Sequence, residues 1–187
     1  MKRVRVLVVL LVAVLASACA RHDDLPVVKD LDLQRYSGRW HEVASIPAWF
    51  ARDCATDTTA EYTPSSDGTV KVVNACRRAD GEREAADGIA RAAGAPGEGK
   101  LEVTFVTVLG QPIWLLAGDY WIVALDKDYR WSVVAHPSRD YGWILSRSPT
   151  LTAATLRDMR DWLAAVGYDT CRVVVTADPG RPRLCDV

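Results

Sequence analysis

Short apolar runs separated by turn residues fill most of the chain between residues 38 and 146. Eight of these runs predict β-strands, because apolar and polar positions alternate within them and turn residues bound them. Eight consecutive strands with short connections favour an all-β fold, an antiparallel up-and-down barrel, since closure removes exposed strand edges. The expected strands cover residues 40–46, 58–63, 69–76, 83–92, 100–108, 120–125, 131–135 and 141–146.

One clear α-helix is predicted after the last barrel strand. Thr152 can cap its start and Gly167 can end it. Apolar residues recur between them every three or four positions, as expected for a helix that packs on one side. This stripe consists of Leu156, Met159, Trp162, Leu163 and Val166. We expect the helix to pack on the barrel wall and residues 171–176 to form a ninth strand that flanks the barrel.

The N-terminal pattern is that of a secretory signal peptide. A basic head is followed by the apolar run 6–15 and by small residues that end at Cys19. The run is shorter than the roughly 20 residues of a membrane span, and Cys19 argues against the alternative of an uncut anchor. The segment resembles the bacterial lipobox, which implies that residues 1–18 are removed and that Cys19 is lipidated. Ala20, where a sorting Asp could stand, points to the outer membrane.

Charge narrows the range of partners. Residues 1–18 hold three basic residues and no acidic one, which leaves 20 basic and 24 acidic residues and a net charge of −4. A mildly acidic chain has no electrostatic reason to bind nucleic acid. We expect residues 19–33 to form a polar, lipidated tether and residues 34–187 to form one domain, long enough to bury a core.

Four cysteines remain besides Cys19, and an even number in an exported chain predicts two disulfides. Cys54 and Cys76 lie at similar distances from the predicted hairpin loop 64–68, so the hairpin brings them together. Cys171 and Cys185 would then close a short C-terminal loop. The chain has no Cys-x-x-Cys pair and no histidine at ligand spacing from a cysteine, so we expect no metal site and no cofactor.

Three motifs carry a resemblance to a known family. Residues 38–44, Gly-Arg-Trp-His-Glu-Val-Ala, resemble the lipocalin G-x-W signature, Asp119 and Tyr120 resemble the second signature, and Arg147 resembles the arginine that ends the last strand. Residues 36–40 and 45–50 look like apolipoprotein D, and residues 141–147 look like the bacterial outer-membrane lipoprotein lipocalins. The resemblance implies a barrel that holds one small apolar ligand. It also suggests a competing disulfide, Cys54–Cys185.

The resemblance to lipocalins implies that Gly38, Trp40 and Arg147 have structural roles. Trp40 supplies a large plug at the start of the first strand, and the Arg147 guanidinium can stack on its indole once the barrel closes. Neither side chain is expected to contact the ligand.

Side chains along a strand alternate between the two faces of the wall, so Trp40 and Arg147 set the expected inward positions. The interior is then mainly apolar, with polar groups at Glu42, Tyr62 and Asn74. Apolar residues also occupy the loops 46–50 and 109–116, which should form the open rim. The residues expected to contact a ligand are Ala44, Ile46, Phe50, Ala60, Tyr62, Val72, Val103, Phe105, Trp114, Tyr141 and Trp143.

This lining favours a protein that binds a fatty acid or lysophospholipid and stores or transports it at the outer membrane. The sequence has no nucleophile elbow, phosphate loop or dinucleotide fingerprint, so we expect no enzyme. Two alternatives remain open: an enzyme that acts on a bound lipid or pigment with Glu42 as its base, and an envelope scaffold without a ligand. The apolar rim could also contact the membrane surface or pack on a second copy as a homodimer.

Overall fold

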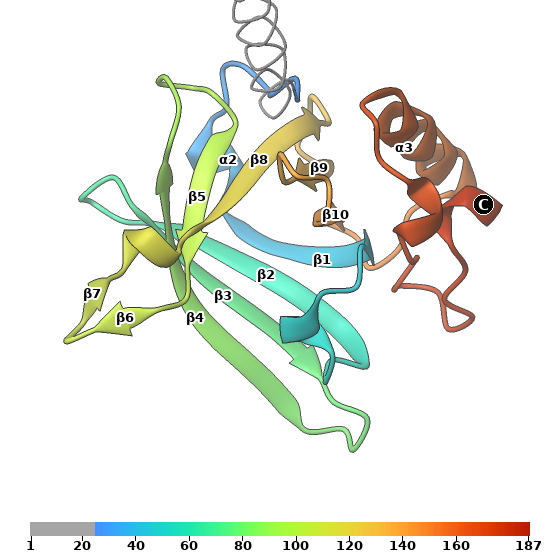
Figure 1. The fold of residues 1–187 in the computed structure, drawn as a ribbon, viewed down its shortest axis with the longest axis horizontal. Coiled ribbons are helices and arrows are strands. Elements are labelled where there is room, and N and C mark those ends of the chain that lie inside the picture. Colours follow the sequence, from blue (N-terminus) through green and yellow to red (C-terminus); the bar gives the residue numbers. More distant parts are fainter. Residues whose placement is uncertain (1–24) are drawn as a thin grey trace, which may run out of the picture.

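The computed structural model describes residues 25–187, and in it eight antiparallel strands close into a barrel (Figure 1). Each barrel strand pairs with the strands before and after it, and β1 pairs with β10 to close the ring. The eight strands agree with the prediction to within a few residues at most ends. They are β1 (Gly38–Ser45), β2 (Thr56–Pro64), β3 (Val70–Arg77), β4 (Arg83–Ala92), β5 (Lys100–Thr104), β8 (Gly118–Leu125), β9 (Trp131–Ala135) and β10 (Gly142–Ser146).

The segment between β5 and β8 differs from the prediction. The strand expected over residues 100–108 ends at Thr104. The chain then leaves the barrel wall as a small hairpin of β6 (Thr107–Val108) and β7 (Gln111–Pro112), which Figure 1 shows projecting from the barrel. A 3-10 helix, η2 (Trp114–Leu116), leads back to β8.

The barrel wall separates two apolar clusters. The inner cluster lies within the barrel and consists of Tyr36, Trp40, Ala60, Tyr62, Val70, Val72, Ala90, Leu101, Ile122, Tyr129, Val134 and Leu145. The outer cluster joins the opposite face of β1 and β8–β10 to helix α3 (Ala153–Ala165), which Figure 1 shows beside the barrel.

Helix α3 forms as its sequence predicts. The Thr152 hydroxyl accepts a hydrogen bond from the Thr155 amide at 3.2 Å, and Gly167 follows the helix with φ of +88°. Leu156, Met159 and Leu163 are buried in the outer cluster, and Trp162 and Val166 pack against it. Burial of this stripe fixes the helix on the barrel wall.

The expected ninth strand is reduced to single bridges. Residues Thr170–Arg172 form the 3-10 helix η3 instead of a strand. Val174 alone bridges to Ser45 on β1 and to Arg183, near a last 3-10 helix, η4 (Leu184–Asp186). The segment therefore flanks the barrel as predicted, beside β1, but its single bridges do not make it a strand.

Residues 25–33 were expected to belong to a tether, yet they pack on the barrel. Leu25 is buried in the outer cluster, and Val28 exchanges backbone hydrogen bonds with Ile122 and Gly99. The short helix α2 (Leu33–Tyr36) follows, capped by the Asp32 carboxylate. The predicted signal peptide and Cys19 lie outside the described residues. From residue 25 onward, the chain contains no helix that is long and apolar enough to cross a membrane.

Both predicted disulfides are present. Cys54 is bonded to Cys76 with a Cα–Cα distance of 5.6 Å, and Cys171 is bonded to Cys185 at 4.9 Å. The competing Cys54–Cys185 pairing is therefore wrong. The first bond ties the connection between β1 and β2 to the end of β3, as expected for neighbouring strands of a hairpin.

Candidate functional site

One end of the barrel is closed by Trp40 and Arg147. The Trp40 side chain is fully buried, and its Nε1 donates to the Tyr36 carbonyl oxygen at 2.8 Å. The Arg147 guanidinium lies over the indole, with Cζ 3.9 Å from the ring centroid. A cation over an indole face is attracted by the ring quadrupole. Both residues take the structural positions that the sequence predicted for them.

Arg147 also holds the first residues of the fold by bonding to their backbone. Its Nη1 donates to the Arg39 carbonyl oxygen at 2.8 Å, and its Nη2 donates to the carbonyl oxygens of Arg35 and Ser37 at 2.9 and 2.8 Å. Gly38 has φ of +87°, and a Cβ there would lie 3.5 Å from Nη1. This backbone conformation favours glycine. The closed end is thus built largely from main-chain carbonyls, which accept most of the hydrogen bonds that Arg147 donates.

The inner wall beyond Trp40 is apolar. Ala60, Tyr62 and Val72 belong to the inner cluster, and Val103 and Trp143 pack against it while staying partly accessible. Their inward orientation agrees with the alternation predicted from sequence. The partly accessible side chains lie at the part of the interior nearest the open end, where a ligand would enter.

Aromatic rings continue this wall to the open rim. Trp143 stacks on Tyr141 with ring centroids 6.4 Å apart, and Tyr141 stacks on Phe50 at 6.1 Å. Trp49 meets Phe50 edge-on at 5.7 Å, and these two side chains are 75% and 56% exposed. We call Trp49, Phe50, Tyr141 and Trp143 the aromatic row. It provides one apolar surface that runs from the interior to solvent.

Phe105 lies against the opposite side of the interior. Gly88 on β4 pairs with the inward-facing Val72, so its missing side chain would point inward. A Cβ on Gly88 would lie 2.8 Å from the Phe105 ring, which occupies that space. Phe105 is 41% exposed. It therefore presents accessible apolar surface inside the barrel, as its sequence position suggested.

A network of tyrosines forms the polar part of the interior. The Tyr36 hydroxyl donates to Ser132 Oγ at 3.1 Å. Because each phenol has a single O–H, the Tyr36 oxygen then accepts from the Tyr120 hydroxyl at 3.0 Å, and the Tyr120 oxygen accepts from the Tyr62 hydroxyl at 2.8 Å. Burial raises the pKa of Tyr36 to about 12 and raises the pKa values of Tyr62 and Tyr120 as well. These phenols stay neutral, so the interior offers hydrogen bonding without charge.

The family comparison agrees with this geometry. Residues 31–178 match the lipocalin-like domain family. The chain belongs to the lipocalin family. Its relatives include temperature-induced lipocalin-1 of Arabidopsis thaliana, 36% identical over 160 residues that cover 85% of this chain and 86% of the relative.

Other similar proteins are bacterial and animal. The outer membrane lipoprotein Blc of Escherichia coli (strain K12) is 34% identical, with 82% of this chain and 83% of the relative covered. Apolipoprotein D of Mus musculus is 31% identical, with 84% and 82% covered. Insecticyanin from the tobacco hornworm Manduca sexta superposes with a TM-score of 0.64 over 81% of this chain and 83% of its own, at 23% identity. That last likeness concerns the fold.

Two predicted lining positions of this lipocalin, Ala44 and Ile46, face the other side of the wall. The pairing of β1 with β10 shifts between Glu42 and Ala44, so Val43 is an extra residue in the ladder. A bulge of one residue reverses the alternation after it. Both side chains are buried in the outer cluster under helix α3. The prediction that they line the interior is therefore wrong.

Trp114 was expected at the mouth, but the structure places its ring elsewhere. The Arg91 guanidinium lies over the Trp114 ring, 4.0 Å from the centroid, and Arg91 is paired with Glu102. Arg91 follows the inward-facing Ala90 and so points away from the interior. Trp114 therefore packs on the outer side of the wall.

Two acidic residues of the sequence motifs, Asp119 and Glu42, have different surroundings. Asp119 pairs with Glu102 in the β5–β8 ladder, but its side chain is half-exposed and lies 3.9 Å from the His136 ring. Glu42 accepts a hydrogen bond from the Ser45 hydroxyl at 2.8 Å. Burial raises the pKa of Glu42, while that hydrogen bond and the positive charge of Arg181 oppose the rise.

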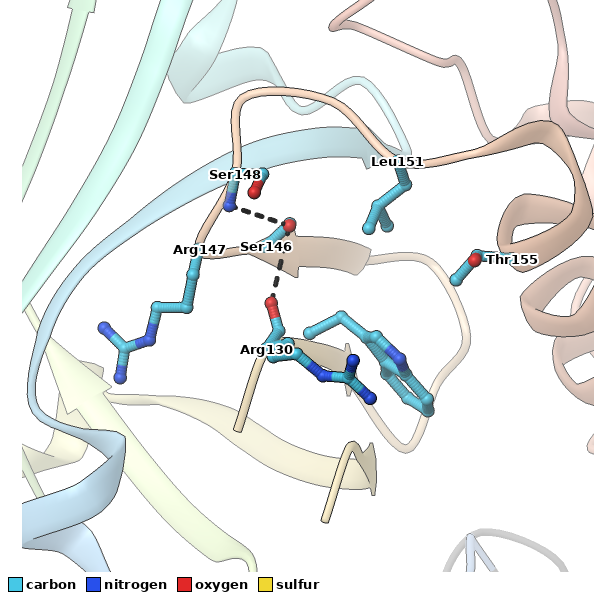
Figure 2. A pocket seen from close by; sticks show the side chains of 7 residues that line it. Arg130, Ser146, Arg147, Ser148, Leu151 and Thr155 are labelled. Atoms are coloured by element: carbon cyan, nitrogen blue, oxygen red, sulfur yellow. Dashed lines mark hydrogen bonds between the residues drawn. The ribbon is translucent and has the colours of Figure 1, made fainter. Parts of the chain in front are cut away.

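A small pocket lies outside the closed end, between β10 and helix α3 (Figure 2). It has a volume of about 260 Å³, and Figure 2 shows Ser146 bonded to the Arg130 carbonyl oxygen and the Ser148 amide beside it. Arg130 is held by two hydrogen bonds to Asp126, at 2.8 and 2.9 Å. Several of the polar groups of this pocket, including the Arg130 guanidinium and the Ser146 hydroxyl, already have partners within the protein, so the pocket is a poorer candidate for ligand binding than the barrel interior. Among residues 25–187, no group of three or more potential metal ligands occurs.

Sequence reasoning missed the tyrosine network as a unit. Tyr62 was recognised as inward, and Tyr120 as part of a motif, but Tyr36 lies before the first strand. Its role depends on how α2 crosses the closed end, which strand alternation does not describe. The available signal in the sequence was an aromatic residue, Tyr36, two positions before Gly38.

Proposed function

We propose that this lipocalin binds a single-chain lipid, a fatty acid or a lysophospholipid, in its barrel and stores or transports it at the outer membrane. The observation that carries the proposal is the continuity of apolar surface from the inner cluster through the aromatic row to the rim. An acyl chain is long and apolar and fits such a path, whereas a compact polar molecule would bury fewer matched contacts.

The relatives support the cellular part of the proposal. The chain is 34% identical to a protein named outer membrane lipoprotein Blc. A signal-like N-terminus that ends at Cys19 fits a lipidated protein of the same kind. We therefore propose that Cys19 carries the lipid anchor and that the barrel lies in the periplasm.

The energetics favour chain length as the property that is recognised. Burial of apolar surface contributes roughly 25 cal/mol per Å². Each methylene that enters the barrel therefore adds to affinity until the interior is full. Neutral tyrosines at the inner end add hydrogen-bonding capacity without requiring a charged ligand.

The test is a titration of the purified protein with saturated fatty acids and monoacylglycerols of increasing chain length, followed by tryptophan fluorescence. Affinity should rise with chain length and then level off. Trp143→Glu should abolish binding, because it places a charge on the inner wall. Trp162→Phe on helix α3 is the matched control, since Trp162 packs in the outer cluster and should not affect affinity.

Extraction of the protein with organic solvent provides an independent measurement. A stoichiometric single-chain lipid in the extract supports the proposal. Flat titrations at every chain length, or a bound pigment in the extract, would contradict it and leave the fold assignment intact.

A further inference from the structure

Three arginines from distant parts of the chain meet at a surface pocket of about 510 Å³. Arg52 lies in the connection between β1 and β2, Arg78 lies in the turn between β3 and β4, and Arg181 lies in the C-terminal segment. The Cys54–Cys76 disulfide, whose Cys54 also lines the pocket, ties the first two segments together. We call this site the arginine pocket.

The three guanidinium groups have only loose partners. The Arg52 Nε lies 3.8 Å from Asp53, the Arg78 Nε lies 4.0 Å from Glu84, and the Arg181 Nη1 lies 3.4 Å from the Ala55 carbonyl oxygen. Charge-assisted hydrogen bonds are normally about 2.7–2.9 Å long. Their donors are therefore not fully engaged within the protein.

Arginines with a structural role in the same protein are bonded more tightly. Arg130 reaches Asp126 at 2.8 Å, and Arg147 reaches the Arg39 carbonyl oxygen at 2.8 Å. Asp53 and Asp80 also line the arginine pocket, but Asp80 accepts from the Glu82 amide in its own turn. The lining itself has three positive and two negative side chains, and two further carboxylates outside the lining, Glu84 and Glu42, interact with Arg78 and Arg181.

The arginine pocket lies at the open end of the barrel, beside the aromatic row. The β1–β2 and β3–β4 connections belong to the end opposite Trp40, because Trp40 lies near the start of β1 and neighbouring strands are antiparallel. Phe50, two residues before Arg52, stacks on Tyr141. A lipid that lies along the aromatic row would therefore carry its polar end towards the arginines.

We propose that Arg52, Arg78 and Arg181 bind the phosphate group of an anionic lipid whose single acyl chain lies in the barrel. This inference rests on the proposed function and adds the chemistry of the headgroup. Guanidinium groups match phosphate oxygens in charge and geometry, and loosely held guanidinium groups can turn towards such a ligand.

The test compares lysophosphatidic acid with the monoacylglycerol of the same acyl chain, since the two lipids differ only in the phosphate. The wild-type protein should bind the phosphate lipid about tenfold more tightly, the factor expected from a few solvent-exposed charge pairs. High salt should reduce this ratio, because exposed charges are screened.

Arginine variants then test whether the preference for the phosphate lipid depends on the arginine pocket. Arg52→Gln combined with Arg78→Gln should bring the ratio close to one and leave monoacylglycerol affinity unchanged. Arg83→Gln combined with Arg157→Gln removes the same charge from exposed positions outside the pocket and should preserve the ratio. Arg181→Gln is tested separately, with a melting curve, because Arg181 also contacts Ala55.

The outcomes are distinct. Equal wild-type affinities for the two lipids would overturn the inference and leave the proposed function standing. If neither lipid binds, the proposed function fails and this inference fails with it. Millimolar inorganic phosphate should lower only the affinity for the phosphate lipid. If phosphate alone binds the wild type as tightly as the phosphate lipid does, free phosphate is the ligand and the lipid assignment is wrong.

Discussion

Trp40 and Arg147 close one end of the barrel through different parts of their side chains. The indole packs in the inner cluster and donates a hydrogen bond to the Tyr36 carbonyl oxygen, whereas the guanidinium covers the indole and donates hydrogen bonds to backbone carbonyls. Each contact involves atoms that point away from the open end. The pair therefore affects the stability of the barrel rather than its choice of ligand.

Trp40→Ala should lower the free energy of unfolding by about 3–5 kcal/mol, because a large, fully buried ring leaves a cavity. Chemical denaturation followed by circular dichroism measures the loss. The order of affinities for acyl chains of different length should stay the same. A variant that unfolds like the wild type, or that prefers another class of lipid, would contradict the structural assignment.

Asp126 makes the stability of the folded protein depend on pH in the acidic range. Hydrogen bonds from Arg130 lower the pKa of Asp126 to about 2, below the unfolded value of about 3.9. A carboxyl with a depressed folded pKa stabilises the fold above the unfolded pKa, and this stabilisation disappears as the pH falls through about 2. Because solvent surrounds Arg130, we expect a contribution of only about 1 kcal/mol above pH 4.

Denaturation of Asp126→Asn across pH 2–7 measures this contribution. The variant should be less stable than the wild type near neutral pH and should approach it near pH 2. Asp128→Asn is the control, since Asp128 is exposed and lies 3.7 Å from Arg130. A stability difference for Asp126→Asn that does not change with pH would argue against the ion pair as its source.

At the level of strands and helices, periodicity predicted most of the fold. Eight strands, the capped helix α3 and the hairpin-linked disulfide all follow from alternation, spacing and turn residues. Alternation fails where the ladder gains a residue. The bulge at Val43 places Ala44 in the outer cluster. No residue in this run of small and β-branched side chains indicates from the sequence where such a bulge lies.

The candidate site was harder to predict than the fold. Inward positions on regular strands, such as Val72 and Trp143, follow from parity. Positions in loops do not, because their direction depends on tertiary contacts such as the packing of Arg91 on Trp114. The arginine pocket likewise joins three segments that no local pattern connects.

The Cys54–Cys76 disulfide should contribute about 3 kcal/mol to stability, since it closes a loop of sequence separation 22. Replacing both cysteines with alanine and measuring the denaturation midpoint tests this value. Cys171→Ala with Cys185→Ala serves for comparison at a separation of 14. Peptide mapping without reduction should recover both bonds, and a peptide that joins Cys54 to Cys185 would contradict the pairing.

On the scale of the whole molecule, the two ends of the barrel differ in chemistry. The closed end consists of backbone carbonyls and paired charges, whereas the open end carries exposed apolar side chains. Leu109 and Leu115, in the segment between β5 and β8, are 98% and 93% exposed. Exposed apolar side chains in a loop can themselves attach a protein to a membrane. Two routes of attachment must therefore be separated: the proposed lipid on Cys19 and the apolar loop.

Cys19→Ser separates these two routes. If the proposed lipid is the anchor, the variant should move from the membrane fraction to the soluble fraction after cell breakage. A lipidated N-terminus with two or more acyl chains attaches stably, whereas a few exposed leucines contribute weaker, reversible contacts. The soluble variant should keep the melting temperature and monoacylglycerol affinity of the wild type, because Cys19 precedes the described fold. Leu109→Ser with Leu115→Ser is the matched control and should stay in the membrane fraction. If Cys19→Ser leaves the membrane only when both leucines are also replaced, the loop holds the protein there.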